Sequence, residues 1–196
     1  MMKPWIAALL LSATLPATAA AADFPAGRII AMASGDWDKD GTPDLAVVAT
    51  PGDDSGDDNG LYVWLAKKTE GRLTPVLSLP NSVWGNLTLY GQEPELTALA
   101  NGSFTLTTKN DAVGRDRWRQ SLTIAYRNFD FIVAGYTFSS YDTIAEEGAE
   151  NSTRECDLNV LTGKGKSNGQ PVAGKAQFVL LKDWKDEIGR SICGLD

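Results

Sequence analysis

The sequence predicts an all-β protein of mostly antiparallel strands, about nine to eleven of them, with little helix apart from an N-terminal leader. Apolar and polar residues alternate in several short runs, for example at 104–107 and at 122–127, as expected of half-buried strands. Turn-forming pairs such as Asn168-Gly169 separate these runs. The pattern fits either a sandwich or two blade-like sheets packed side by side.

Residues 1–22 have the pattern of a secretory signal peptide, with Lys3 in the basic region, an apolar run at 6–11 and small residues at 17–22. This run is too short to span a bilayer, and no other stretch approaches the ~18–20 apolar residues that a membrane helix needs. Neither cysteine lies near the cleavage zone, which excludes a lipoprotein anchor. We therefore expect an exported protein, periplasmic or secreted and without a membrane anchor, in which residues 23–196 form a single all-β domain.

The charge balance is acidic, with a formal net charge of −7 at pH 7. Removal of the leader, which carries one lysine and no acidic residue, would bring the net charge to −8. A nucleic-acid-binding protein needs a basic face, so a nucleic-acid partner is not expected.

The segment that follows the first predicted strand reads D-x-D-x-D-G-x-x-D and leads into an apolar run at 45–49. Carboxylates at this spacing converge on one point when a glycine, here Gly41, makes the sharp turn. Calcium takes ~6–8 oxygen ligands, so the pattern favours a structural Ca²⁺ ion as cofactor. The expected metal ligands are four carboxylates and one backbone carbonyl: Asp36, Asp38, Asp40 and Asp44, with the carbonyl of Thr42.

This loop is not an EF-hand, because position 12, counted from Asp36, is Val47, which has no ligand atom to offer in its side chain. The flanking segments are also short and apolar instead of being amphipathic over three turns. The alternative is an acidic turn that happens to be rich in aspartate and binds no metal.

The segment G-D-W-D-K-D-G-T-P-D-L-A-V-V resembles the FG-GAP or VCBS repeat of integrin α-chain propellers and many exported bacterial proteins. Residues 36, 38, 40, 42 and 44 match the repeat's calcium positions, and 60–65 resembles the third strand of such a blade. The resemblance implies a calcium hairpin between the first two strands of a sub-lobe at 23–80. It occurs once, over about residues 28–80, whereas a closed propeller needs ~4–8 blades. We therefore expect the calcium loop but not the propeller.

Another acidic stretch, 53–58, carries four more carboxylates in a loop. It either completes a second cation site or is a solvated loop. The runs 61–65 and 73–79 then predict a hairpin, and 81–100 holds the boundary between sub-lobes if there is one.

The C-terminal half, 101–196, predicts a meander of three strands at 104–107, 122–126 and 131–138. The connection between the first two strands concentrates arginine and tryptophan, the residues enriched at binding anchors. The candidate partner-binding residues are Arg115, Arg117, Trp118 and Arg119. The alternative is that these arginines pair with nearby carboxylates while Trp118 packs on the sheet edge.

Cys156 and Cys193 are the only cysteines, an even number in a chain predicted to be exported, and predict a disulfide. Two isolated cysteines without any histidine make a zinc site a poor alternative. The loop-entropy model assigns such a disulfide roughly 4 kcal/mol. A final hairpin is predicted from 156–161 and 175–181 around the Asn168-Gly169 turn.

The absence of histidine removes Ser-His-Asp, Cys-His and histidine–metal sites, and no glycine-rich phosphate loop is present. Carboxylate pairs such as Asp142 with Glu146 or Glu147 are what any acidic protein offers by chance. We therefore expect a non-catalytic binding or interaction protein, with an unidentified protein or glycan as partner. The alternative is a carbohydrate-directed protein, either a lectin or a weak hydrolase.

Overall fold

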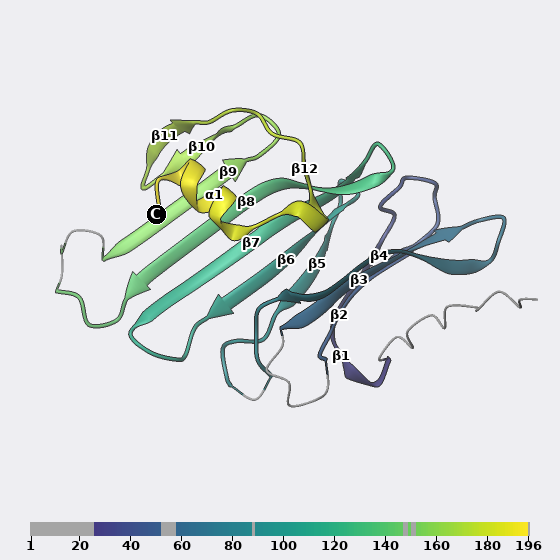
Figure 1. The fold of residues 1–196 in the computed structure, drawn as a ribbon, viewed down its shortest axis with the longest axis horizontal. Helices are drawn as coiled ribbons and strands as arrows, with labels where there is room; N and C mark the ends of the chain where they lie inside the picture. The colour runs from purple at the N-terminus through teal and green to yellow at the C-terminus, as the bar shows by residue number, and fades with distance from the viewer. Residues whose placement is uncertain (1–25, 52–57, 88, 147–148, 150–151, 196) are drawn as a thin grey trace, which may run out of the picture.

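The computed structural model describes residues 26–51, 58–87, 89–146, 149 and 152–195. The predicted leader and most of the acidic loop at 53–58 lie outside these residues. Within them the chain forms two antiparallel sheets and one short helix, which confirms the predicted all-β class (Figure 1). No helix among these residues is both long enough and apolar enough to cross a membrane.

The first sheet is a four-stranded meander in the order β1-β2-β3-β4. The second strand is buried along almost its whole length, as its continuous apolar run predicts. The bounds are β1 Ile29–Gly35, β2 Asp44–Ala49, β3 Asn59–Lys67 and β4 Arg72–Val83, preceded by the 3-10 turn η1, Ala26–Arg28.

The second sheet has eight strands, seven of them in the order β11-β10-β9-β8-β7-β6-β5, with β12 paired to β8. The predicted three-strand meander is its centre, β6-β7-β8. The bounds are β5 Glu95–Leu99, β6 Ser103–Asn110, β7 Asp116–Arg127, β8 Asp130–Asp142, β9 Thr153–Asn159, β10 Lys164–Ser167, β11 Gln170–Ala173 and β12 Val179–Leu180.

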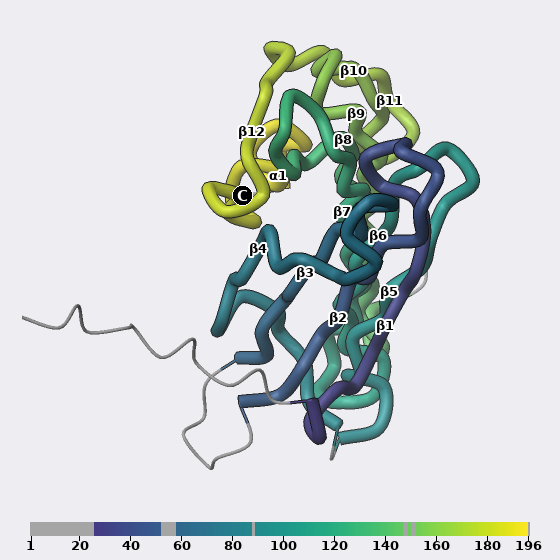
Figure 2. The backbone as a smooth tube through the Cα atoms, turned by 90° about the vertical axis from the view of Figure 1, so that its right-hand side faces the viewer, coloured from purple at the N-terminus to yellow at the C-terminus, as the bar shows by residue number. Residues whose placement is uncertain are grey.

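One hydrophobic core joins the two sheets, because buried residues of both belong to the same cluster. The edge strand β1 packs along the edge strand β5, and the Trp37 ring lies 5.0 Å from that of Phe104 on β6. Figure 2 shows the four-stranded sheet on one side of the eight-stranded sheet. We call the face of the eight-stranded sheet that carries Phe104 its inner face, and the opposite face its outer face.

Two sequence predictions about strands are corrected by the structure. The arginine-rich connection is a loop only up to Arg115, since β7 already begins at Asp116. The Asn168-Gly169 turn is present but joins β10 to β11, whereas only Val179–Leu180 of the run at 175–181 forms a strand, on β8. The strand β10 has no alternating apolar pattern; Gly165 lets it approach β9 closely, because a Cβ there would lie 2.1 Å from the Asp157 carbonyl oxygen.

The C-terminal segment crosses the inner face of the eight-stranded sheet as the 3-10 turn η2 (Leu181–Asp183) and the helix α1 (Asp186–Cys193) (Figures 1 and 2). Gly189 lets the helix approach the Tyr136 ring, since a Cβ there would lie 2.7 Å from it. The predicted disulfide is confirmed: Cys193, at the end of α1, is bonded to Cys156 on β9, with 6.0 Å between the Cα atoms.

Candidate functional site

The Asp loop, residues 36–43, joins β1 to β2 at the end of the first sheet. It gathers Asp36, Asp38 and Asp40, each of which offers a carboxylate oxygen within 4.8 Å of the others. The strands on either side pair without a register shift from Ala31 and Val48 to Gly35 and Asp44, so the loop closes a two-stranded hairpin. Three of the predicted ligands are therefore brought together.

The loop holds its shape through its own carboxylates. Asp36 Oδ2 accepts the Gly41 N–H at 3.0 Å, Asp38 Oδ1 accepts the Asp40 N–H at 3.2 Å, and Asp40 Oδ1 accepts the Thr42 N–H at 2.8 Å. Gly41 supplies the turn with a φ of +87°. The other Asp36 oxygen, Oδ1, is buried and has no hydrogen-bond partner among the described residues.

Asp44 lies outside this cluster. Its side chain is 1% exposed, and its two oxygens accept backbone N–H groups from different segments, Oδ2 from Trp37 at 2.7 Å and Oδ1 from Ala66 at 2.8 Å. Burial raises the pKa of this carboxyl, while the two backbone hydrogen bonds act in the opposite direction. The geometry gives Asp44 a role in fastening the loop to the end of β3, a role that the sequence pattern did not reveal.

The Asp loop also contacts the second sheet. Gly102, in the β5–β6 turn, lies so close that a Cβ there would be 3.0 Å from the Asp36 carbonyl oxygen and 3.1 Å from Lys39 Cε. Trp37, between two of the clustered aspartates, is 1% exposed. Burial raises the pKa of Tyr126 on β7, and the negative charge of Asp38 adds to this shift. The loop thus lies where the two sheets meet.

The donor chemistry fits a hard divalent cation. Three carboxylates, one of which has a buried oxygen without a partner, are all-oxygen ligands, which suit Ca²⁺, whereas zinc sites use cysteine and histidine. Asp58, the described residue of the acidic loop, is not part of the cluster; its N–H donates to Asn81 Oδ1 at 2.6 Å. The other aspartates of that loop lie outside the described residues.

The arginine–tryptophan segment does not form one continuous patch. Arg115 pairs with Asp142, and this hydrogen bond lowers the pKa of the carboxyl. Trp118 packs on Trp84, with 4.8 Å between ring centroids. Successive strand residues point to opposite faces, so Arg119 projects away from Trp118.

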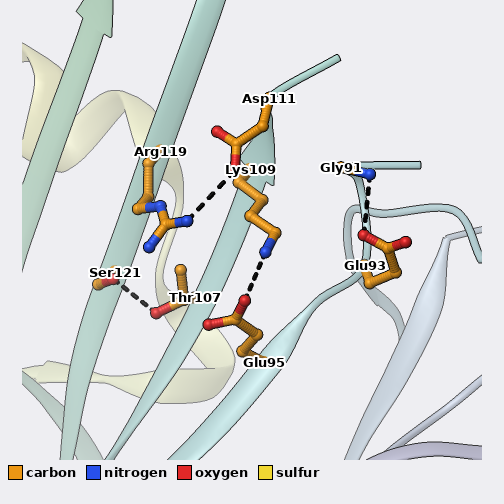
Figure 3. A network of polar contacts seen from close by, with 8 residues as sticks. All are labelled: Gly91, Glu93, Glu95, Thr107, Lys109, Asp111, Arg119 and Ser121. Atoms are coloured by element: carbon orange, nitrogen blue, oxygen red, sulfur yellow. Dashed lines mark hydrogen bonds and ion pairs between the residues drawn. The ribbon is translucent and has the colours of Figure 1, made fainter. Parts of the chain in front are cut away.

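The outer face of the eight-stranded sheet carries polar side chains that bond one another (Figure 3). Arg119 donates to Asp111 at 3.2 Å and Lys109 pairs with Glu95. On the same face the hydroxyls of Thr107 and Ser121 lie 2.6 Å apart. Arg115 and Arg119 therefore pair with local carboxylates, whereas Arg117 Nη1 is buried without a hydrogen-bond partner among the described residues.

A cleft of about 550 Å³ lies between the end of β4, the inner face of β6 and β7, and the η2–α1 segment. A smaller cavity of about 220 Å³, beside Trp118 and Arg190, shares two lining residues with it. The polar and aromatic residues that line the cleft include Asp58, Trp84, Thr108, Gln120, Lys182, Trp184, Lys185, Asp186 and Glu187.

Sequence reasoning missed this cleft. One signal was available: Thr108 and Gln120 are in phase with the apolar inner-face residues Leu106 and Leu122, so they are polar residues on a core stripe. Comparison of the chain with protein-family models, with curated proteins and with solved structures gave no match.

Proposed function

We propose that this protein is an exported, non-catalytic binding protein whose Asp loop holds a structural Ca²⁺ ion. The observation that carries the proposal is the convergence of three aspartates, with one buried oxygen lacking a partner, where the two sheets meet. The resemblance to the FG-GAP repeat supports it, since the loop joins the first two strands of a four-stranded meander. The proposed ligands are Asp36, Asp38 and Asp40, with the Thr42 carbonyl as a further donor.

The proposed role of the ion follows from the position of the loop. Three clustered carboxylates repel one another, and a divalent cation would turn this repulsion into attraction. Because Trp37 and Gly102 tie the same loop to the second sheet, the ion would stabilise the packing of the sheets as well as the hairpin. An ion that binds only the folded state adds about 2.7 kcal/mol at a hundredfold excess over its Kd.

The experiment is a melting curve of the oxidised protein in Ca²⁺, in Mg²⁺ and in chelator. We expect the melting temperature to rise by several degrees in Ca²⁺ and the Asp38→Asn variant to lose this rise, since asparagine keeps the hydrogen bond to Asp40 but removes the charge. Asp157→Asn, the same change on β9 of the other sheet, is the matched control and should keep the full response. Equal melting temperatures in calcium and chelator would contradict the proposal.

Glycan binding is the second candidate function, and the cleft favours it. The cleft brings Trp84 and Trp184 together with uncharged polar side chains, an aromatic surface beside hydrogen-bonding groups. A protein partner at the arginine–tryptophan segment has less support, because Arg115 and Arg119 already pair with carboxylates and Trp118 packs on Trp84. No residues in the cleft are assigned a catalytic role.

A further inference from the structure

We propose that the cleft between the two sheets and the η2–α1 segment is a binding site for a neutral oligosaccharide. The inference builds on the proposed function, since it names the ligand class that a non-catalytic binding protein of this architecture would take. It is independent of the calcium ion, because the Asp loop contributes no residue to the cleft.

The floor of the cleft has unmet hydrogen-bonding capacity. Thr108 on β6 and Gln120 on β7 are directly opposite each other in the sheet and are 7% and 8% exposed. Neither side chain hydrogen-bonds to another described residue, and neither has an atom among the buried ones without a partner, so their polar atoms face the open cleft. A hydroxyl and an amide supply both donors and acceptors without net charge, as sugar hydroxyls require.

Tryptophan rings form the walls. Trp84, 37% exposed, and Trp184 line the cleft, and Trp118 lines the smaller cavity beside it. Their orientations are fixed: Trp84 packs on Trp118, and Trp184 Nε1 donates to Asp186 Oδ1 at 3.2 Å. A pyranose ring has an apolar C–H face and hydroxyls at its edge, so it can place that face on an indole while its edge bonds the floor.

The rim argues against a strongly charged ligand. It carries three carboxylates and two ammonium groups: Asp58, Asp186 and Glu187, with Lys182 and Lys185. Because charges of both signs are mixed on the rim, a polyanion would be repelled by the carboxylates and a polycation by the ammonium groups. Each of these groups can hydrogen-bond to a neutral hydroxyl.

The dimensions favour more than one sugar unit. The cleft lies within the ~300–1,000 Å³ range of small-molecule sites. The smaller cavity extends it past Gln120 and Asp186, which line both. The simpler occupant is ordered water, which would also satisfy the polar pair on the floor; the experiment below distinguishes the two.

The test is direct binding of the oxidised protein, in saturating Ca²⁺, to an array of neutral oligosaccharides: α- and β-linked glucans, galactans, mannans, xylans and chito-oligosaccharides. Calorimetry with the best binder then compares variants. We expect Gln120→Leu and Thr108→Val to weaken binding by about tenfold or more, because each leaves a sugar hydroxyl without its partner. Thr107→Val is the matched control, since it changes the neighbouring threonine on the outer face and should leave the affinity unchanged.

Three results would overturn the proposal: no array sugar bound by the folded protein, a bound sugar whose affinity neither cleft variant changes, or capture of a protein by this cleft instead. If the array is empty while Gln120→Leu raises the melting temperature, the occupant is water. Loss of the calcium response in the melting experiment bears only on the Asp loop. The two proposals can therefore fail separately.

Discussion

Two neighbouring cross-strand pairs of the eight-stranded sheet face opposite ways and differ in how their polar groups are satisfied. On the outer face Thr107 and Ser121 bond each other at 2.6 Å. One residue further along, on the inner face, Thr108 and Gln120 are opposite each other without bonding any described residue. The two pairs have similar chemistry, so the contrast indicates that unmet hydrogen-bonding capacity, and not polarity itself, marks a candidate site.

The largest expected effect comes from removing the disulfide that fastens the η2–α1 segment to the inner face. The double variant Cys156→Ala/Cys193→Ala releases α1 from β9, and because the disulfide spans 37 residues it should lower the free energy of unfolding by about 4 kcal/mol. Urea unfolding measures this loss. A loss below about 1 kcal/mol would show that helix packing, not the cross-link, holds α1 against the sheet.

Changing one threonine on each face should affect stability differently. Thr107→Val should cost about 1 kcal/mol, because it leaves the Ser121 hydroxyl without its partner in a half-buried position. Thr108→Val should cost close to nothing without ligand, because no protein hydrogen bond is lost. Urea unfolding of the two variants measures these losses in the free energy of unfolding. Equal losses would contradict the proposed difference between the two faces.

The smallest effect is expected at the exposed ion pair of Arg115 and Asp142. The arginine holds the pKa of the Asp142 carboxyl below its ordinary value of 3.8, so the pair stabilises the fold above that pH and the contribution is lost as pH falls through the lowered pKa. Asp142→Asn should lower stability slightly at neutral pH, where the pair is formed, and leave it unchanged at the lowest pH, so the acid limb of the stability curve becomes shallower. Thermal melts over an acid pH series provide the measurement, and an unchanged acid limb would contradict it.

What the sequence could predict depends on how local the information is. The Asp loop is a run of consecutive residues, so the convergence of Asp36, Asp38 and Asp40 could be predicted from the sequence. The Cys156–Cys193 bond could be predicted because the chain has only two cysteines. The position of Asp44 could not, because one of the N–H groups that donate to its carboxylate, that of Ala66, lies near the end of β3.

The cleft could not be predicted, since its walls come from β4, β6, β7 and the η2–α1 segment, which are far apart in the chain. The short strand β10 was missed for a related reason: it is held in the sheet by a glycine that permits close backbone approach, a feature without any apolar pattern. Strand identity in the centre of the sheet was predictable because alternation there is strong.

The burial of Trp37 against Phe104 has a consequence for modularity. In a propeller each blade covers the apolar face of its neighbour. Here the second sheet covers the apolar face of the four-stranded meander. A fragment that stops after β4 would leave the meander's apolar face in water, together with the tryptophan beneath its Asp loop. The meander is therefore not an independent unit. If it were grafted into another scaffold, that scaffold would have to cover its apolar face in place of the second sheet.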